Sequence, residues 1–253
     1  MMKLKSCVAG ILILTGLMGA AAGAQGSEGP LVPFRANFHL DRKGIGSGRL
    51  IFTLEKAVDG GYVYRSELHP TGLAALFISL VTQTSDFQVV DGQLRAGTYE
   101  FKQTGGQSDS ETIKFDWSEK VGITDRDGKP RRKTEITPGV SDTQLINLVV
   151  AADVAAGTLA PEYRFLDHSK ISTYAAKTLP DAKLTVGDVT YDTKVVELSD
   201  TSGDGTITVW MAPALHYLPV QIRDLDKKSD VTMAMQGITF SEAAPAAATK
   251  SGG

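Results

Sequence analysis

Hydrophobic and polar residues alternate along most of this chain. The first such run is residues 34–41, in which Phe34, Ala36, Phe38 and Leu40 are separated by polar residues. This alternation is typical of a strand with one buried side and one solvent-facing side. Similar runs cover residues 49–56, 62–68, 86–90, 94–103, 112–117, 122–124, 163–167, 170–177, 189–198, 206–211, 218–224 and 231–240. The pattern predicts a protein built mainly of short β-strands.

The segments between these runs contain good hairpin turns. Pairs or triplets of Asp and Gly, which tolerate positive φ angles, stand at residues 59–61, 91–92, 105–106, 127–128 and 203–205. Hairpins favour an up-and-down antiparallel sheet, and a sheet of this many strands must curl or close. We therefore expect a mainly β protein: a single antiparallel curled sheet or barrel-like domain with one or two short helices packed against it. A two-sheet sandwich is the alternative, because periodicity does not separate the two.

Residues 141–157 break the strand pattern and predict a helix. Ser141 can cap the first turn, and Gln144 three residues later can complete a capping box. Asp142 suits the positive end of the helix dipole, and Gly157 supplies a stop signal at the other end. Apolar residues cover almost all sides of the segment. We therefore expect most of this helix to be buried.

The two ends of the chain are expected to lie outside the folded domain. Two lysines precede an apolar run, and small residues ending at Ala24 follow it, which is typical of a cleavable signal peptide over residues 1–24. As a helix the apolar run would be roughly 16 Å long, about half the hydrocarbon core of a bilayer, so we expect no transmembrane anchor. Residues 25–32 then form a linker, residues 33–240 a single β-rich domain, and residues 241–253 a disordered low-complexity tail.

Net charge and cysteine content exclude several classes of function. The 253 residues include 26 Lys and Arg against 29 Asp and Glu, for a net charge of -3 at pH 7, which is not the basic balance of a nucleic-acid binder. The single cysteine, Cys7, precedes the apolar run and would be removed with the signal peptide. A mature chain without cysteine has no disulfide and no thiolate ligand, and Cys7 is not placed for lipidation. We expect a soluble periplasmic protein.

No residue pattern in the chain defines a catalytic or metal site. The four histidines, His39, His69, His168 and His216, match no zinc spacing, and we interpret them as solvated surface residues without partners. Acidic pairs near Asp125, Asp200 and Asp224 are explained by hairpin turns. We therefore expect no metal and no cofactor, and a protein that is not an enzyme. A hydrolase whose site is not visible in the sequence stays as the third hypothesis.

Several short sequence motifs, taken together, resemble those of a known family. They are Gly44–Gly48, Gly72-Leu73-Ala74 with Phe77, Phe115-Asp116-Trp117, Pro138–Asp142, Ala156-Gly157, Trp210–Pro213 and Tyr217–Val220. In this order the motifs resemble the "domain of unknown function 3108" family of exported proteobacterial proteins, over about residues 34 to 240. The resemblance implies a periplasmic, mostly β protein and transfers no catalytic residue. Curled exported sheets with a helix on the concave face are also similar to periplasmic lipoprotein carriers, which is an analogy of fold only.

Two functions remain open beside the enzyme. The first is a periplasmic binding protein that shelters a lipid or other apolar ligand in its curled sheet. Its candidate ligand-binding residues are Leu73, Leu76, Phe77, Ile78, Leu80, Trp117 and Trp210. Most of them lie in residues 72–81, a nearly uniform apolar segment that predicts a short helix or loop at the entrance or lining of a cavity, or else a plug of the core. The second function is an envelope protein–protein interaction or assembly factor without a small ligand.

Overall fold

The computed structural model describes residues 29–43, 46–76, 79–106, 108–127, 129, 132–203, 205–227 and 229–241, without the side chains of Leu73 and Ala74. Within these residues, fifteen strands form one sheet. The first eight are β1 (Phe34–Arg42), β2 (Gly46–Lys56), β3 (Tyr62–Pro70), β4 (Leu80–Val90), β5 (Gln93–Thr104), β6 (Asp109–Asp116), β7 (Val121–Arg126) and β8 (Arg132–Glu135). The others are β9 (Val140–Asp142), β10 (Glu162–Asp167), β11 (Lys170–Val186), β12 (Val189–Asp200), β13 (Gly205–Ala212), β14 (Leu218–Asp226) and β15 (Asp230–Phe240). The helices are η1 (Gly72–Leu76), α1 (Ile146–Ala156) and η2 (Pro213–Leu215).

The sheet consists of two meanders, and the first strand, β1, pairs with the last strand, β15, in the middle of the sheet. Its order is β8-β7-β6-β5-β4-β3-β2-β1-β15-β14-β13-β12-β11-β10-β9. All neighbours are antiparallel except β9 and β10, which run parallel. In the part of the chain described, β8 and β9 are the two edges and do not pair with each other. The predicted single curled antiparallel sheet is therefore confirmed, as an unclosed sheet and not as a sandwich.

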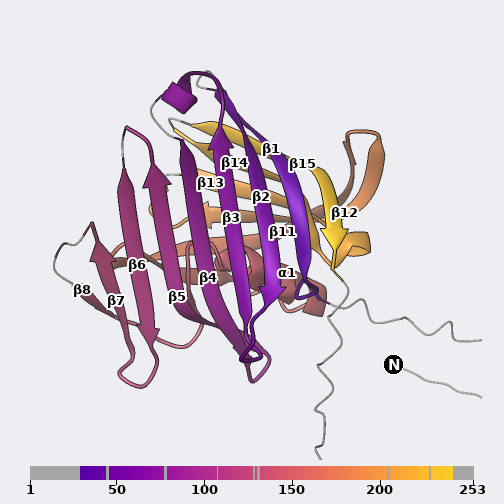
Figure 1. Ribbon diagram of the computed structural model, residues 1–253. Coiled ribbons are helices and arrows are strands. Elements are labelled where there is room, and N and C mark those ends of the chain that lie inside the picture. Colours follow the sequence, from indigo (N-terminus) through magenta and orange to yellow (C-terminus); the bar gives the residue numbers. More distant parts are fainter. Residues whose placement is uncertain are drawn as a thin grey trace, which may run out of the picture.

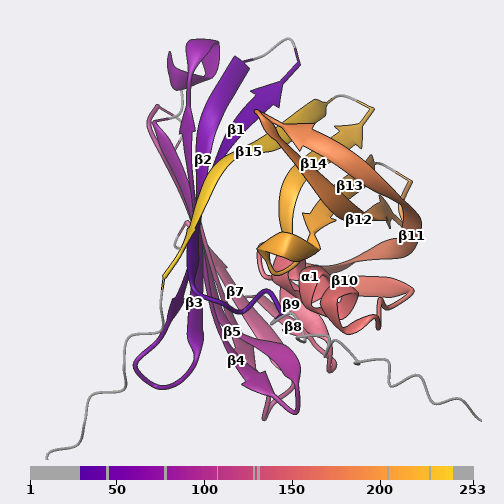
Figure 2. The same cartoon turned by 90° about the vertical axis from the view of Figure 1, so that its right-hand side faces the viewer.

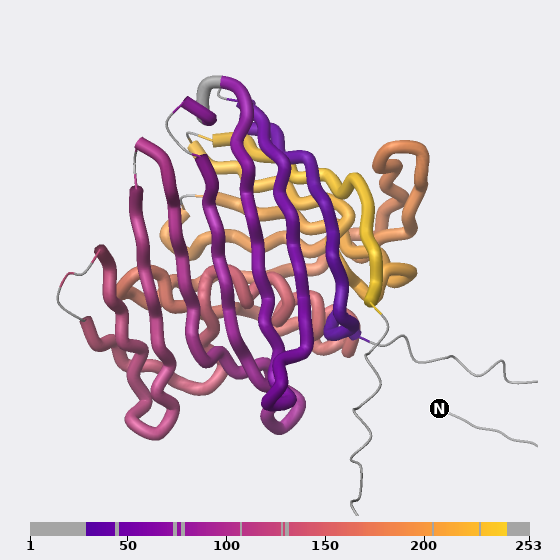
Figure 3. The backbone as a smooth tube through the Cα atoms, in the orientation of Figure 1, coloured from indigo at the N-terminus to yellow at the C-terminus, as the bar shows by residue number. Residues whose placement is uncertain are grey.

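The sheet folds back on itself so that its two halves face each other. Strands β1–β8 form one broad wall, and β10–β15 form the opposite wall (Figures 1 and 2). Strand β1 pairs with β15 along its whole length, from Phe34 opposite Phe240 to Arg42 opposite Val231. The tip of the β11–β12 hairpin projects beyond the rest of the sheet (Figure 3). This arrangement gives the protein a concave interior between the two walls.

Helix α1 lies between the two walls (Figure 2). Leu148 belongs to a buried cluster that includes Phe34, Phe52 and Ile113 from the first wall, whereas Val150 belongs to a second cluster on the opposite wall. The helix therefore contacts both walls with different sides, as the expectation of burial on most sides requires. No helix of the described residues is long and apolar enough to span a membrane.

The start of this helix differs from the prediction. The helix begins at Ile146, and Ser141 is buried in strand β9, where its hydroxyl donates to the carbonyl of Asp142. The predicted capping box is therefore wrong. Instead, the Asp142 carboxylate accepts the backbone N–H groups of Gln144 and Leu145, so Asp142 closes the turn before the helix. Gly157 ends the helix in a left-handed conformation with φ 71°, as predicted.

The bounds of several strands also differ from those predicted from the sequence. Leu80 and Val81, expected in the apolar segment, begin strand β4, and the segment itself contains the short helix η1. Strands β8 and β9 lack the alternating pattern and were not predicted. Strand β11 continues past Lys177 through Pro180 because its register shifts there, between Leu179 and Ala182. A bulge tolerates proline because the missing N–H is not needed for a ladder hydrogen bond.

Candidate functional site

A cavity of about 450 Å³ lies between the two walls beside α1. Apolar side chains of both walls line it, together with Ile146 and Asn147 of the helix. The apolar lining from the β1–β4 wall is Leu40, Leu50, Phe52, Leu68 and Val81, and that from the opposite wall is Phe165, Leu198, Ile207, Ile222 and Met233. The alternation of inward and outward side chains on each strand produces this lining, since both walls turn their apolar faces to the interior. We call this space the interior cavity.

An aromatic crevice adjoins the interior cavity. It shares Phe52, Asn147 and Ile222 with the cavity and is lined further by Phe34, Phe38 and Tyr64. The Phe52 ring stacks on Tyr64 with centroids 5.8 Å apart, and Phe38 meets Phe52 edge-on at 5.4 Å. Burial raises the pKa of the Tyr64 hydroxyl far above its usual range, with a further contribution from the Asp142 charge. The crevice therefore offers an apolar surface in a water-poor environment.

An acidic pocket also adjoins the interior cavity. This pocket, of about 360 Å³, shares Tyr174, Asp200, Ile207 and Asp224 with the cavity and adds Asp226. Burial raises the pKa of the Asp224 carboxyl; the nearby charge of Asp226 raises it further, and Arg42 opposes both. In the sequence these acids are explained as turn residues alone. They share a site because β12 and β14 bring two distant turns to the same end of one wall.

A buried polar network connects the start of α1 to the first wall. Ser85 donates to the Asp142 carboxylate at 2.8 Å, on the same Oδ1 that accepts the two backbone N–H groups. Gln144 accepts from the Ser66 hydroxyl at 2.9 Å and donates to the Tyr64 carbonyl at 2.8 Å. Within the described residues Asp142 Oδ2 has no hydrogen-bond partner, and burial raises the pKa of this carboxyl to about 6. The network fixes the start of α1, and therefore the two helix residues that line the interior cavity, Ile146 and Asn147.

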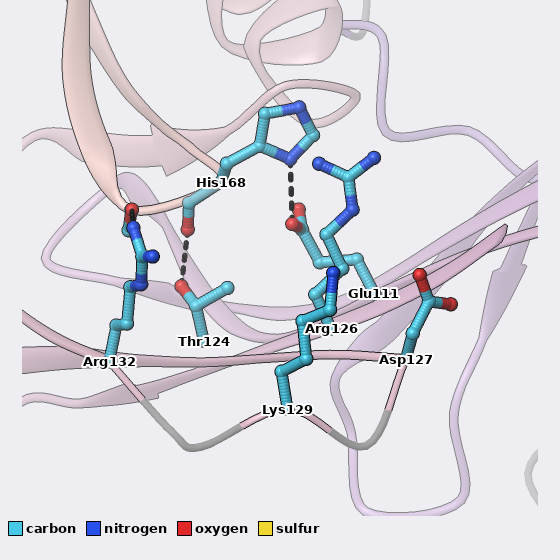
Figure 4. A pocket seen from close by; sticks show the side chains of 8 residues that line it. Glu111, Thr124, Arg126, Asp127, Lys129, Arg132 and His168 are labelled. Atoms are coloured by element: carbon cyan, nitrogen blue, oxygen red, sulfur yellow. Dashed lines mark hydrogen bonds and ion pairs between the residues drawn. The ribbon is translucent and has the colours of Figure 1, made fainter.

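A second pocket, of about 660 Å³, lies where the β10–β11 turn meets β6–β8; we call it the seam pocket (Figure 4). His168 Nδ1 lies 2.6 Å from Glu111 Oε2, and only 4% of the Glu111 side chain is exposed. Thr124 donates its hydroxyl to the His168 carbonyl, and Thr134 donates to the Ser169 carbonyl at 3.1 Å. His168 does lie at the surface, with 53% of its side chain exposed, but the interpretation that it has no partner is wrong, because its contact with Glu111 joins the two walls.

Cations and acids are mixed around the seam pocket. Arg126, Lys129 and Arg132 line it beside Glu111 and Asp127. The guanidinium of Arg126 pairs with Asp109, which holds the pKa of that carboxyl below its usual range. Among the described residues, no three His, Cys, Asp or Glu side chains are grouped so that they could hold a metal ion. The contacts that cross between the two walls at this pocket are hydrogen bonds, and the Arg126–Asp109 ion pair lies within the first wall.

Among the residues proposed from the sequence, those whose side chains are described do not line the interior cavity. Leu76 on η1 is 72% exposed, and Leu80 is half-buried at the start of β4. Trp117 follows β6, where its indole N–H donates to the Ala96 carbonyl at 2.7 Å, and Trp210 lies on β13 against the first core cluster. None of these four described side chains lines the interior cavity. Phe77, Ile78 and the side chain of Leu73 lie outside the described residues.

A family model for a protein of unknown function, DUF3108, matches residues 34–236. The chain belongs to the DUF3108 family. This confirms the resemblance found in the sequence, and the matched residues cover β1 through most of β15. No curated protein matches the DUF3108 chain.

Two of the solved structures that match this chain are described only by the numbers of their DUF families. A beta-barrel-like protein of domain of unknown function DUF1849 from Brucella abortus is similar over 84% of this chain and 99% of that chain, with a TM-score of 0.57 and 9% identity. A DUF1329 family protein from Desulfovibrio piger matches over 84% of this chain and 87% of that chain with 10% identity and a TM-score of 0.24. The first likeness supports the barrel-like fold alone.

Proposed function

We propose that this DUF3108 protein is an exported, periplasmic binding protein that holds an apolar or amphiphilic molecule, such as a lipid, in the interior cavity without transforming it. The observation that carries the proposal is the cavity of about 450 Å³ between the two walls and α1, whose lining is more apolar than polar. Ligand sites of proteins are concave, mostly apolar and about 300–1,000 Å³ in volume. The cavity has this size and this lining.

The burial of the lining residues also supports a ligand site. Leu68, Val81, Ile207 and Met233 point inward and yet are only half-buried, whereas Leu54 in the core is 1% exposed. Side chains in a packed core leave few voids, so inward-facing apolar side chains are normally fully buried. An apolar ligand in the cavity would remove this surface from water and gain about 25 cal/mol for each Å².

The apolar segment found in the sequence is proposed as the entrance. Helix η1 connects the ends of β3 and β4 that carry Leu68 and Val81, both of which line the cavity. The exposed Leu76 therefore belongs to a connection beside the cavity rather than to its lining. Single exposed leucines are common on protein surfaces, so the position of η1 and not its exposure supports this role.

Binding of the neutral fluorescent probe N-phenyl-1-naphthylamine tests the proposal. Ile207 and Thr208 are neighbours on β13, and only Ile207 lines the cavity. We expect Ile207→Trp to fill the cavity and weaken probe binding by about tenfold or more, and Thr208→Trp to leave binding unchanged. A second cavity variant, Val81→Phe on the opposite wall, guards against a folding defect, and circular dichroism checks all three. Equal binding by cavity and control variants would overturn the proposed site.

The identity of the natural ligand and the compartment need separate measurements. Mass spectrometry of solvent extracts from the protein, purified from the periplasm of the cells that express it naturally, should detect a bound apolar molecule. An empty protein would favour the assembly-factor hypothesis. Cell fractionation and the mass of the mature chain test export: we expect a periplasmic chain that begins after Ala24, and an unprocessed cytoplasmic chain would contradict export.

A further inference from the structure

A further pocket, of about 400 Å³, lies at one end of the first wall. In an antiparallel meander every second connection lies at the same end of the sheet, so the β2–β3, β4–β5 and β6–β7 connections meet there (Figure 1). Asp59 belongs to the first of these connections, Gln88 and Arg95 flank the second, and Trp117 begins the third. We call this space the turn pocket. None of its described lining residues lines the interior cavity, so an occupant would be a second ligand.

Aromatic side chains supply most of the apolar lining of the turn pocket. The Tyr62 ring stacks on the buried Phe87 ring, with centroids 5.3 Å apart and an angle of 13° between the planes. The indole N–H of Trp117 donates to the Ala96 carbonyl at 2.7 Å, which fixes the orientation of that ring. Tyr62 and Trp117 both pack against the core and are nevertheless only half-buried. Rigid aromatic surface therefore remains available in the pocket to a flat apolar group of a ligand.

Two carboxylates line the turn pocket, and a backbone N–H group fixes each of them. Asp59 Oδ1 accepts the N–H of Gly61 at 3.0 Å, and Asp86 Oδ1 accepts the N–H of Thr98 at 2.6 Å. A Cβ atom added to Gly97 would overlap Asp86 Oδ1, so the absence of a side chain there leaves the space that this carboxylate occupies. No described residue donates a hydrogen bond to the Oδ2 atom of either acid. Each carboxylate therefore has a fixed orientation and one oxygen left for a ligand.

The cation of the turn pocket is held by an aromatic ring and not by these acids. The guanidinium carbon of Arg95 lies 5.5 Å from the centroid of the Trp117 ring. Within the part of the chain that the structure describes, Arg95 forms no ion pair, although Asp59 and Asp86 line the same pocket. A guanidinium in contact with a ring keeps its N–H donors for other partners. Together with the exposed amide of Gln88, the pocket therefore presents both donors and acceptors that the protein does not use itself.

We propose that the turn pocket binds a neutral saccharide unit, with the C–H face of the sugar ring on Tyr62 and Trp117. Sugar hydroxyls both donate and accept, so they can donate to the two carboxylates and accept from Arg95 and Gln88. This site is independent of the ligand proposed for the interior cavity.

The charges in the lining argue against other small ligands. A simple anion would be repelled by Asp59 and Asp86, and a simple cation would be repelled by Arg95. A zwitterion such as a free amino acid could pair with both signs, but Asp59, Asp86 and Arg95 are exposed. Ion pairs at exposed positions contribute little, so we expect hydrogen bonds and ring contact to dominate binding.

Isothermal titration calorimetry with three neutral trisaccharides tests this inference. Maltotriose, cellotriose and tri-N-acetylchitotriose differ in linkage and substituents and share the flat sugar ring. We expect at least one of them to bind with a Kd of about 1 mM or lower, and free phenylalanine to bind at least about tenfold more weakly. Saccharide binding should not change at high salt, because the ligand carries no charge to be screened. Failure of all three to bind, or tighter binding of phenylalanine, would overturn the proposal.

Variants locate the saccharide in the turn pocket. Arg95→Gln and Asp86→Asn each remove a charged hydrogen-bonding partner at an exposed position and should weaken binding about tenfold. Arg65→Gln is the matched control, because Arg65 is exposed on the face of β3 opposite to Tyr62. All three variants should bind N-phenyl-1-naphthylamine as the wild type does, which checks folding and separates this site from the interior cavity. If both pocket variants bind the saccharide as tightly as the control does, the turn pocket is not the site.

Discussion

The two walls of this protein are joined in two different ways. At the ladder junction, strands β1 and β15 exchange backbone hydrogen bonds along their whole length. At the side-chain junction, residues 140–145 and the β10–β11 turn reach β3–β8 through individual side chains: Asp142 to Ser85, Gln144 to Ser66, and Thr124 to the His168 carbonyl. The first junction makes the sheet continuous, and the second holds it curled.

This difference explains how the sheet can enclose a cavity without closing. A closed barrel needs strand tilt and register that satisfy a full ring of ladder hydrogen bonds. Here a few side chains replace the last ladder, so the distance between the walls is set by α1 and by these contacts. The side-chain junction should therefore be the more sensitive of the two to pH and to single polar substitutions, and the ladder junction should respond mainly to loss of apolar packing.

The largest effect is expected at the ladder junction. Phe38 on β1 is 3% exposed and packs edge-on against Phe52. Phe38→Ala should lower the free energy of unfolding by about 3–5 kcal/mol, because it removes buried apolar surface and leaves a cavity. Urea unfolding followed by circular dichroism measures the change. Arg35→Ala, at an exposed position of the same strand, should change stability by less than about 0.5 kcal/mol. Similar values for both variants would contradict the role of packing at this junction.

The next effect is a pH dependence at the side-chain junction. Burial raises the pKa of Asp142 from 3.8 to about 6. The folded protein therefore holds this proton more tightly than the unfolded chain, so the contribution to stability is largest below about pH 4 and is lost as pH rises to about 6. The loss should be about 3 kcal/mol, from a shift of about two pKa units. Equilibrium unfolding at a series of pH values between these limits measures it.

Asp142→Asn separates this group from the other acids. Its side-chain oxygen can still accept from Ser85 and from the two backbone N–H groups, and its amide stays uncharged at every pH. Acids whose pKa is lowered in the folded protein, such as Asp109, stabilise the protein more as the pH rises. Their contribution is the same in the wild type and in the variant. We expect the variant to match the wild type near pH 4 and to exceed its stability at pH 7. Parallel pH profiles for the two proteins would show that Asp142 is not the titrating group.

The sequence predicted the ladder junction better than the side-chain junction for a physical reason. Alternation of apolar and polar residues identifies a strand and its buried face, so β1 and β15 were recognised within one residue at either end. The contacts of Asp142 and His168 join residues 57 positions apart in each case, to Ser85 and Glu111, and no local pattern records such pairs. A buried aspartate beside a serine is indistinguishable in sequence from a helix cap.

The candidate site was likewise predictable only as far as local alternation of residues determines it. That a curled sheet would have an apolar concave face was predictable, but which apolar residues line it depends on the curl. Val81 lines the interior cavity, and its neighbour Leu80 does not, because successive residues of a strand face opposite sides. The acids of the adjoining pocket are turn residues in the sequence and become neighbours only through the strand order. Leu198 and Asp200 are two residues apart, so they lie on the same face of one strand. This spacing was the sequence signal that a carboxylate lies on the same face as the apolar lining.

The smallest effect is expected from the His168 contact of the side-chain junction. His168 has a φ of 55°, a left-handed conformation that Asn also tolerates, so His168→Asn removes the imidazole with little backbone strain. The Glu111 side chain, 4% exposed, would lose its partner, with partial compensation from the nearby charge of Arg126. We expect a loss of about 1–2 kcal/mol in urea unfolding at pH 7. Adding Glu111→Gln should recover part of it, because the uncharged amide is less costly to bury, whereas His39→Asn at an exposed position should change nothing. Additive effects of the two substitutions at residues 168 and 111 would mean that the His168–Glu111 contact does not hold the walls together, and that at the β10–β11 turn the hydroxyls of Thr124 and Thr134 do so instead.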